Sequence, residues 1–151
     1  MEQFTNFLFD EWPLSLAFIF ITLLLARSFL EPMLTGVKNI KAQDAVRIMN
    51  NEGTLTLDVR LDKEFKEGHI IDAVHIPLGA LPSRINELES YKGNTAVIYC
   101  QSGMRSKQAG AILKKHGFED MYSIDGGMGA WLAANMPIEK TVKKKNKKSK
   151  E

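Results

Sequence analysis

The sequence predicts an α/β fold, with a parallel sheet flanked by helices on both faces and one apolar helix in front of it. Three observations support this prediction. From residue 42 onward, short β-branched runs alternate with stretches of helical periodicity, which is typical of parallel strands joined by helical crossovers. The length of 151 residues suits one ordinary domain with additional segments. A charge-free apolar run precedes the alternating part.

The apolar run covers Trp12–Ala26, and no charged residue interrupts it. It is short for a membrane span, but extension through Arg27 to Leu30 gives a helix of about 28 Å, close to a hydrocarbon core of roughly 30 Å. A cleaved signal peptide is disfavoured because no lysine or arginine precedes the run. A buried core helix would usually show a polar face. We therefore expect a transmembrane helix at residues 12–30.

The positions of the basic residues predict an orientation. Arg27, Lys38, Lys41 and Arg47 all follow the run, so the positive-inside rule places the N-terminus outside and the rest in the cytoplasm. The protein is then expected to be a single-pass protein of the cell membrane. The predicted parts are an N-terminal segment at 1–11, the transmembrane helix at 12–30, a linker at 31–37, a domain at 38–139 and a basic disordered tail at 140–151.

The basic charge of the chain lies in the tail. Residues 140–151 hold seven lysines and one glutamate, whereas residues 38–139 hold thirteen acidic and twelve basic residues. A nucleic-acid partner is not expected, because the domain has neither a basic surplus nor a nucleic-acid motif. Two interpretations of the tail stay open, a solvated segment and a segment attracted to anionic membrane lipid.

The elements of the domain are predicted in order from periodicity and from turn residues. Apolar residues at i, i+3, i+4 and i+7 predict a helix over 42–49. The elements expected after it are a strand over 54–59, a helical turn over 64–68, a short strand over 74–76, a helix over 81–88, a strand over 95–99, a helix ending at Gly117, a strand over 121–124 and a last helix after Gly126-Gly127.

Cys100 is the only cysteine of the chain, and it lies where the strand over 95–99 turns into a helix. Ligands of open α/β sheets bind at the carboxyl ends of strands. A helix N-terminus and a nearby cation favour the reactive thiolate, and Arg105 can supply that cation. Gly103 lets the loop curl so that its N–H groups point inward. These features predict a nucleophile, and an inert buried thiol is the alternative.

The stretch from Cys100 to Ser106 resembles the active-site loop of rhodanese-type sulfurtransferases. Between the cysteine and the arginine stand Gln101, Ser102, Gly103 and Met104, and Ser106 follows the arginine. Three further stretches match the family in the expected order, namely Leu57-Asp58-Val59-Arg60, Glu64 to Ile70 leading to Ile76-Pro77, and Asp125 to Trp131. The resemblance covers about residues 38–138. One departure is Asp72, where the family usually carries glycine.

The resemblance implies a rhodanese-like sheet and a membrane-anchored sulfurtransferase that carries sulfane sulfur as a persulfide on Cys100. The donor would be a small molecule or a protein persulfide, and the acceptor a thiol, a protein or cyanide. Cys100 and Arg105 would be catalytic, and Asp58 and Arg60 would brace the loop or meet the substrate. No cofactor is needed for this chemistry. No metal is expected, because one cysteine and three scattered histidines give no ligand spacing.

Two other function classes stay open. One is a membrane-bound scaffold that uses the same fold for protein contacts only. The other is a cysteine-dependent phosphatase or an arsenate reductase. Their loops usually place five residues between cysteine and arginine, whereas this chain has four, which suits a single sulfur better than a tetrahedral oxyanion.

Overall fold

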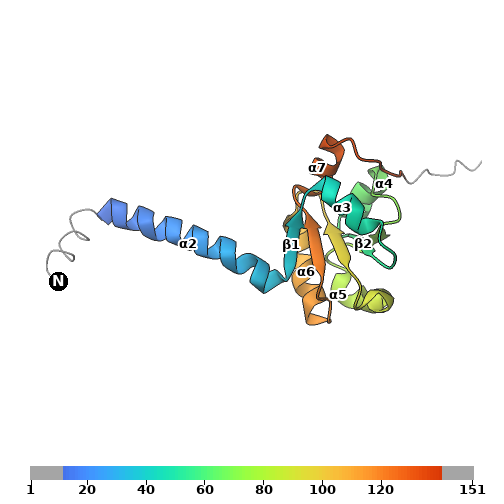
Figure 1. Cartoon of the computed structure of the whole chain (residues 1–151), viewed down its shortest axis with the longest axis horizontal. Coiled ribbons are helices and arrows are strands. Elements are labelled where there is room, and N and C mark those ends of the chain that lie inside the picture. The colour runs from blue at the N-terminus through green and yellow to red at the C-terminus, as the bar shows by residue number, and fades with distance from the viewer. Residues whose placement is uncertain (1–11, 141–151) are drawn as a thin grey trace, which may run out of the picture. The chain divides into compact units, whose positions relative to one another are not determined.

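Five short strands form one sheet in the order β1-β5-β4-β2-β3 (Figure 1), and every neighbouring pair is parallel. The computed structural model describes residues 12–140. The predicted N-terminal segment and the tail beyond Lys140 lie outside the described residues. The strands are β1 (Val37–Ile40), β2 (Leu55–Asp58), β3 (Val74–His75), β4 (Ala96–Tyr99) and β5 (Met121–Ile124). The predicted parallel sheet is confirmed, with β4 at its centre.

Helices cover both faces of this sheet (Figure 1). One face carries α3 and α7, and the other carries α5, η1 and α6, as the two core clusters indicate. The bounds are α3 (Ala42–Met49), α4 (Asp62–Glu67), α5 (Leu81–Arg84), η1 (Ile85–Tyr91), α6 (Met104–Lys115) and α7 (Gly127–Ala133). The architecture is therefore three-layered, as the alternation of strands and helices predicts.

The central strand β4 explains why the core has two halves. Successive side chains of a strand point to opposite faces. Accordingly, Val97 and Tyr99 pack in the cluster under α3 and α7, while Ala96 and Ile98 pack in the cluster under α5, η1 and α6. All four residues are fully buried. Because helices pack on both faces of β4, the position of Cys100, the residue that follows this strand, is fixed.

The edge strand β1 is not among the predicted elements. It has only four residues, and Lys38 and Asn39 in its middle are exposed, so its sequence carries little strand signal. It forms because its backbone pairs with β5 in register from Val37–Met121 to Ile40–Ile124. Pairing of this kind depends on tertiary contacts, which local propensity does not encode.

The chain divides into two units, Met1–Leu34 and Thr35–Glu151. The first contains most of α2, a helix that runs from Trp12 to Thr35. It continues through Pro32, where the sequence analysis places a linker.

The predicted membrane span at residues 12–30 is wrong. Within residues 12–140, no helix combines the length and the apolar character that crossing a bilayer requires. The charge-free run Trp12–Ala26 extends only about 22 Å at 1.5 Å per residue, and the hydrocarbon core is roughly 30 Å thick. The expected single-pass topology, with the N-terminus outside and the domain in the cytoplasm, is withdrawn with the span.

Candidate active site

The candidate site lies where β2, β4 and β5 end, at one edge of the sheet. Cys100 directly follows β4, and Asp58 closes β2. The register pairs Asp58 with Tyr99. Because β2 and β4 are parallel, the segments after Asp58 and after Tyr99 emerge at the same edge, as predicted.

The loop after β4 wraps around the sulfur of Cys100. The backbone N–H of Gly103 donates to Cys100 Sγ across 3.1 Å, and Ser106 Oγ lies 3.9 Å from the same sulfur. Gly103 has φ of +92° and forms the N-cap of α6. A side chain at this left-handed position would be strained. Glycine is therefore what allows the chain to reverse and begin the helix beside the sulfur.

The cysteine side chain is completely buried, with no exposed surface. Burial opposes ionisation of the Cys100 thiol, but hydrogen bonds from backbone N–H groups of the loop outweigh it and hold the pKa below its usual value. These N–H groups belong to Ser106, Ser102 and Gly103. The loop backbone is thus the main stabiliser of the thiolate.

The N-terminus of α7 holds the carbonyl groups of the loop. Met128 N–H donates to the carbonyl oxygen of Cys100 across 2.8 Å, and Gly129 N–H donates to that of Gln101 across 3.2 Å. In a trans peptide the C=O and the following N–H point in opposite directions. Fixing the Gln101 carbonyl toward α7 therefore turns the N–H of Ser102 away from α7, consistent with its hydrogen bond to the sulfur.

Arg105 forms a two-pronged ion pair with Glu64 of α4. Its Nη1 donates to Glu64 Oε2 across 2.8 Å, and its Nη2 donates to Oε1 across 2.7 Å. Glu64 Oε2 also accepts the backbone N–H of Leu61 across 2.9 Å. The bonds from Arg105, helped by the Leu61 N–H, lower the pKa of Glu64 to about 2, although partial burial opposes the shift. Both terminal nitrogens of Arg105 are thus bonded to Glu64, and its charge also lies close enough to the Cys100 sulfur to act on it, since Glu64 first and then Cys100 raise the pKa of Arg105. The role of Arg105 as the cation beside the sulfur stays a prediction.

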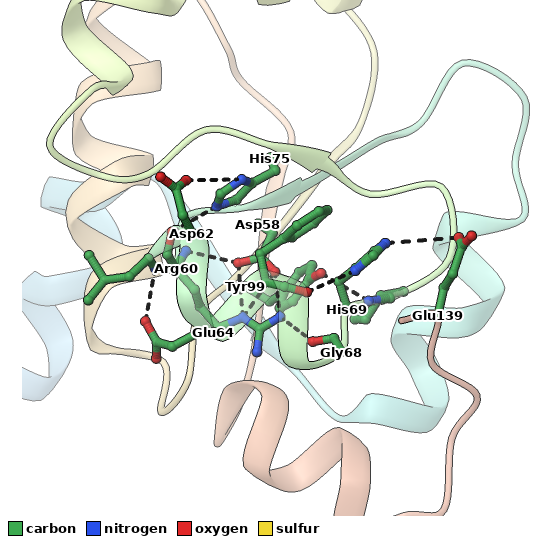
Figure 2. Close-up of polar contacts among 12 residues, drawn as sticks. Asp58, Arg60, Asp62, Glu64, Gly68, His69, His75, Tyr99 and Glu139 are labelled. Atoms are coloured by element: carbon green, nitrogen blue, oxygen red, sulfur yellow. Dashed lines mark hydrogen bonds and ion pairs between the residues drawn. The ribbon is translucent and has the colours of Figure 1, made fainter. Parts of the chain in front are cut away.

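Asp58 and Arg60 form a second, buried ion pair (Figure 2). Arg60 Nη2 and Nε donate to Asp58 Oδ2 across 2.7 and 2.9 Å, and Nη2 also donates to the carbonyl oxygen of Gly68 across 2.7 Å. The guanidinium lies 5.5 Å from the centre of the Tyr99 ring. These contacts tie the end of β2 to the segment after α4. They reach the Cys100 loop only through neighbouring residues.

His69 and His75 both contact α4 through Phe65, and Figure 2 shows both histidines near this helix. The ring of Phe65 stacks between those of His69 and His75, with centroid distances of 3.8 and 4.2 Å. His69 Nδ1 contacts the carbonyl oxygen of Phe65, and His75 Nε2 contacts that of Arg60, both across 3.0 Å. Both histidines are thus bonded to backbone, and they steady the helix that carries Glu64.

A hollow of about 250 Å³ opens beside the loop. Polar and apolar side chains share its lining, which consists of Arg60, Glu64, Glu67, Gly68, Gln101, Met128, Leu132 and Ile138. It reaches the loop at Gln101, next to the buried cysteine. Of the other predicted loop residues, Ser102 is exposed, Met104 is 64% exposed and Ser106 is buried.

Sequence reasoning missed two parts of this site. It includes Glu64 only as part of a matching motif, although an acidic residue three positions after an N-cap is a signal for a capping interaction. It gives no role in the loop to the Gly126-Gly127 pair, and a Cβ at Gly127 would overlap the carbonyl oxygen of Cys100. Glu64 and Gly127 both contact the Cys100 loop from segments that are distant along the chain.

Comparison with known proteins gives one family. Residues 41–134 match the family model described as a rhodanese-like domain. A sulfurtransferase of Allochromatium vinosum is 37% identical over 92 residues, which cover 61% of this chain and 84% of that protein. The uncharacterized protein YibN of Escherichia coli K12 is 25% identical over 91% of this chain and 97% of its own length.

A solved structure is similar to the domain as well. The crystal structure of a rhodanese-like domain protein from Staphylococcus aureus superposes with a TM-score of 0.61 and is 27% identical. The match covers 70% of this chain and all of that chain.

Proposed function

The chain belongs to the rhodanese-like family, and on this premise we propose that it is a sulfurtransferase that carries sulfane sulfur as a persulfide on Cys100. One observation carries the proposal. The only cysteine of the chain is enclosed by a loop whose N–H groups lower the pKa of its thiol. Such a loop suits a nucleophile that is anionic both before and after it accepts a sulfur atom.

The first step is attack of the Cys100 thiolate on the outer sulfur of a donor. With thiosulfate, the bond between the two donor sulfurs breaks, sulfite leaves with the bonding electrons, and Cys100 becomes a persulfide anion. The N–H groups that stabilise the thiolate are placed to stabilise this anion in turn. Because Cys100 has no exposed surface, the loop or its neighbours must move before the donor reaches the sulfur.

In the second step an acceptor thiolate or cyanide attacks the outer sulfur. The bond to Cys100 breaks, its thiolate is restored, and the acceptor leaves as a persulfide or as thiocyanate. Atoms and electrons balance over the two steps without an external oxidant or reductant. The hollow beside Gln101 is the space available to the donor and the acceptor.

The contacts of Arg105 favour sulfur transfer over phosphate chemistry. A phosphatase needs its loop arginine to hold a dianionic phosphoryl group, which requires the two terminal nitrogens. Here both nitrogens are bonded to Glu64. The shorter spacing of four residues between Cys100 and Arg105 supports the same preference.

The test is mass spectrometry of the full chain after incubation with thiosulfate or with cysteine persulfide. Wild type should gain one sulfur, and dithiothreitol should remove it. Cys100→Ser, which keeps the side-chain volume but cannot form a persulfide, should gain none and should release no thiocyanate from cyanide. Since Cys100 is the only cysteine, the adduct has a single possible thiol site.

Two results would overturn the proposal. One is the absence of a sulfur adduct on folded wild type with both donors. The other is full transfer activity in Cys100→Ser. Hydrolysis of a phosphate ester that depends on Cys100, without sulfur transfer, would instead support the phosphatase alternative. The absence of both activities in folded wild type would support the scaffold.

A further inference from the structure

Glu64 is bonded to Arg105, the arginine of the Cys100 loop. We propose that Glu64 is a specificity-determining residue which neutralises Arg105 beside the Cys100 loop and thereby makes the site select sulfur donors of low negative charge against dianionic thiosulfate. The favoured class is a persulfide carried on a cysteine. This inference rests on the proposed sulfur transfer and adds the class of donor.

The geometry of the ion pair between Arg105 and Glu64 supports the neutralisation of Arg105. The two terminal nitrogens of Arg105 meet the two carboxylate oxygens of Glu64 at 2.8 and 2.7 Å. This fork occupies two of the donor directions with which the guanidinium could otherwise bind an anionic sulfur donor. The side chains of Arg105 and Glu64 are 30% and 25% exposed, so solvent screens them less than a surface pair.

The carboxylate of Glu64 is held independently of Arg105. The backbone N–H of Leu61 donates to its Oε2, which fixes the side chain at the first turn of α4. The stack of Phe65 between two histidines fixes the helix itself. The position of the Glu64 carboxylate therefore does not depend on Arg105 alone.

The lining of the hollow beside Gln101 supports the preference for donors of low negative charge. Among the residues that line it in the described part of the chain, the one cation is Arg60, which is bonded to buried Asp58. Glu67 adds a further carboxylate to Glu64. Met128, Leu132 and Ile138 supply apolar surface. A small dianion finds no uncompensated cation in this lining, whereas a cysteine persulfide with its apolar stem meets fewer repulsive charges.

The charge at the sulfur can be measured without sulfur transfer, by alkylation of Cys100. Iodoacetate is an anion and iodoacetamide is neutral, and both react with the thiolate. Both reagents also require the same opening of the loop around the buried sulfur. A change in the ratio of their rate constants, iodoacetate over iodoacetamide, therefore reports a change in the local charge.

Glu64→Gln should raise this ratio about tenfold at an ionic strength of about 10 mM, because Arg105 then becomes an uncompensated cation. The matched control is Glu89→Gln on η1, which removes the same charge and breaks the 2.6 Å ion pair of Glu89 with Lys92. This variant should leave the ratio unchanged. The double variant Glu64→Gln/Arg105→Gln should return the ratio to the wild-type value, since both charges are gone. An unchanged ratio in Glu64→Gln, or no return in the double variant, would overturn the inference.

Wild type alone provides a test that does not depend on the folding of a variant. With Glu64 in place, the thiolate gives the site a net negative charge, so the rate with iodoacetate should rise as salt screens the repulsion. The rate with iodoacetamide should stay flat. A fall of the iodoacetate rate with salt would reveal a cationic site and overturn the inference.

A transfer assay separates this inference from the proposed function. In Glu64→Gln the kcat/KM for thiosulfate should rise several-fold relative to that for cysteine persulfide, mainly through a lower KM. If the alkylation ratio changes as expected but neither donor yields a persulfide, the proposed function fails and the role of Glu64 in setting the charge stands. If transfer proceeds and neither ratio changes, the inference about Glu64 fails and the proposed function stands.

Discussion

The backbone N–H of Met128 donates to the carbonyl oxygen of Cys100 across 2.8 Å, which joins the last helix of the domain to its only cysteine. This contact requires the turn before α7 to approach the loop closely. At Gly127, with φ of +56°, a Cβ would overlap the carbonyl oxygen of Cys100. The position of α7 thus helps to set the chemistry of the loop after β4.

Gly127→Ala should therefore lower the reactivity of Cys100 as well as the stability of the domain. Displacement of the turn frees the Cys100 carbonyl and misaligns the N–H groups that stabilise the thiolate, so the pKa of the thiol should rise. The measurement is the pH dependence of alkylation by iodoacetamide. Gly93→Ala is the matched control, because Gly93 also has a positive φ of +84° and a Cβ there would meet no atom within 4 Å. Equal pH profiles in the two variants would contradict the prediction.

The depressed pKa of Glu64 predicts a particular pH dependence of stability. A carboxyl group whose pKa is lower in the folded than in the unfolded chain stabilises the fold above the unfolded pKa, and this contribution is lost as pH falls toward the folded pKa. For Glu64 the window runs from the ordinary value of 4.5 down to about 2.

In urea titrations, wild type should be more stable than Glu64→Gln at pH 6, and the difference should shrink as pH falls through this window. Arg105→Gln should make the free energy of unfolding less dependent on pH in this window, because it removes the main cause of the lowered pKa of Glu64. Free energies of unfolding that run parallel for wild type and Glu64→Gln over the whole window would refute the assignment.

Much of the fold follows from local patterns. The helix predicted over 42–49 and the strand predicted over 121–124 have the observed bounds, and the strand predicted over 95–99 differs by one residue. These elements have strong periodicity or β-branched runs, and tertiary packing reinforces the same preference. The position of Cys100 at the end of the central strand follows from them.

Pairings between distant segments are not encoded in local patterns. The bonds between Arg105 and Glu64 join residues 41 positions apart, and the strand β1 exists through its register with β5. The closeness of Arg105 to Cys100 along the chain predicts a cation beside the sulfur, but it gives no sign that Glu64 binds the same guanidinium. The predicted membrane span at residues 12–30 is wrong because it includes the residues from Arg27 onward, whereas the uncharged run itself has only 15 residues.

The buried pair of Asp58 and Arg60 predicts a large cost for removing one partner. Arg60 is 2% exposed and Asp58 is fully buried, so Arg60→Met would leave a carboxylate without compensation. The free energy of unfolding should fall by about 3–5 kcal/mol. The double variant Asp58→Asn/Arg60→Met should recover much of the loss, because no buried charge then remains. A single variant as stable as wild type would contradict the structural role that we assign to the pair.

The surface pair of Arg84 with Glu87 is the control for this experiment. Its two bonds, of 2.6 and 2.8 Å, come from Nε and Nη2 of the guanidinium, the same two nitrogens that bind Asp58 in the buried pair. Both side chains are exposed, so water replaces the lost contacts. Arg84→Met should change stability far less than Arg60→Met, and a comparable loss would mean that burial is not the cause.

Asp72 predicts a gain in stability on substitution. It has φ of +59°, a left-handed backbone that costs most side chains about 1–2 kcal/mol and aspartate somewhat less. This is also the position at which the family usually carries glycine. Asp72→Gly should therefore raise the free energy of unfolding by up to about 1 kcal/mol, measured by urea denaturation.

Asn135→Gly is the matched comparison, since Asn135 has a similar φ of +53° and asparagine tolerates this conformation well. Its gain should be smaller. A loss of stability in Asp72→Gly would mean that the carboxylate makes a contact worth more than the backbone strain it causes.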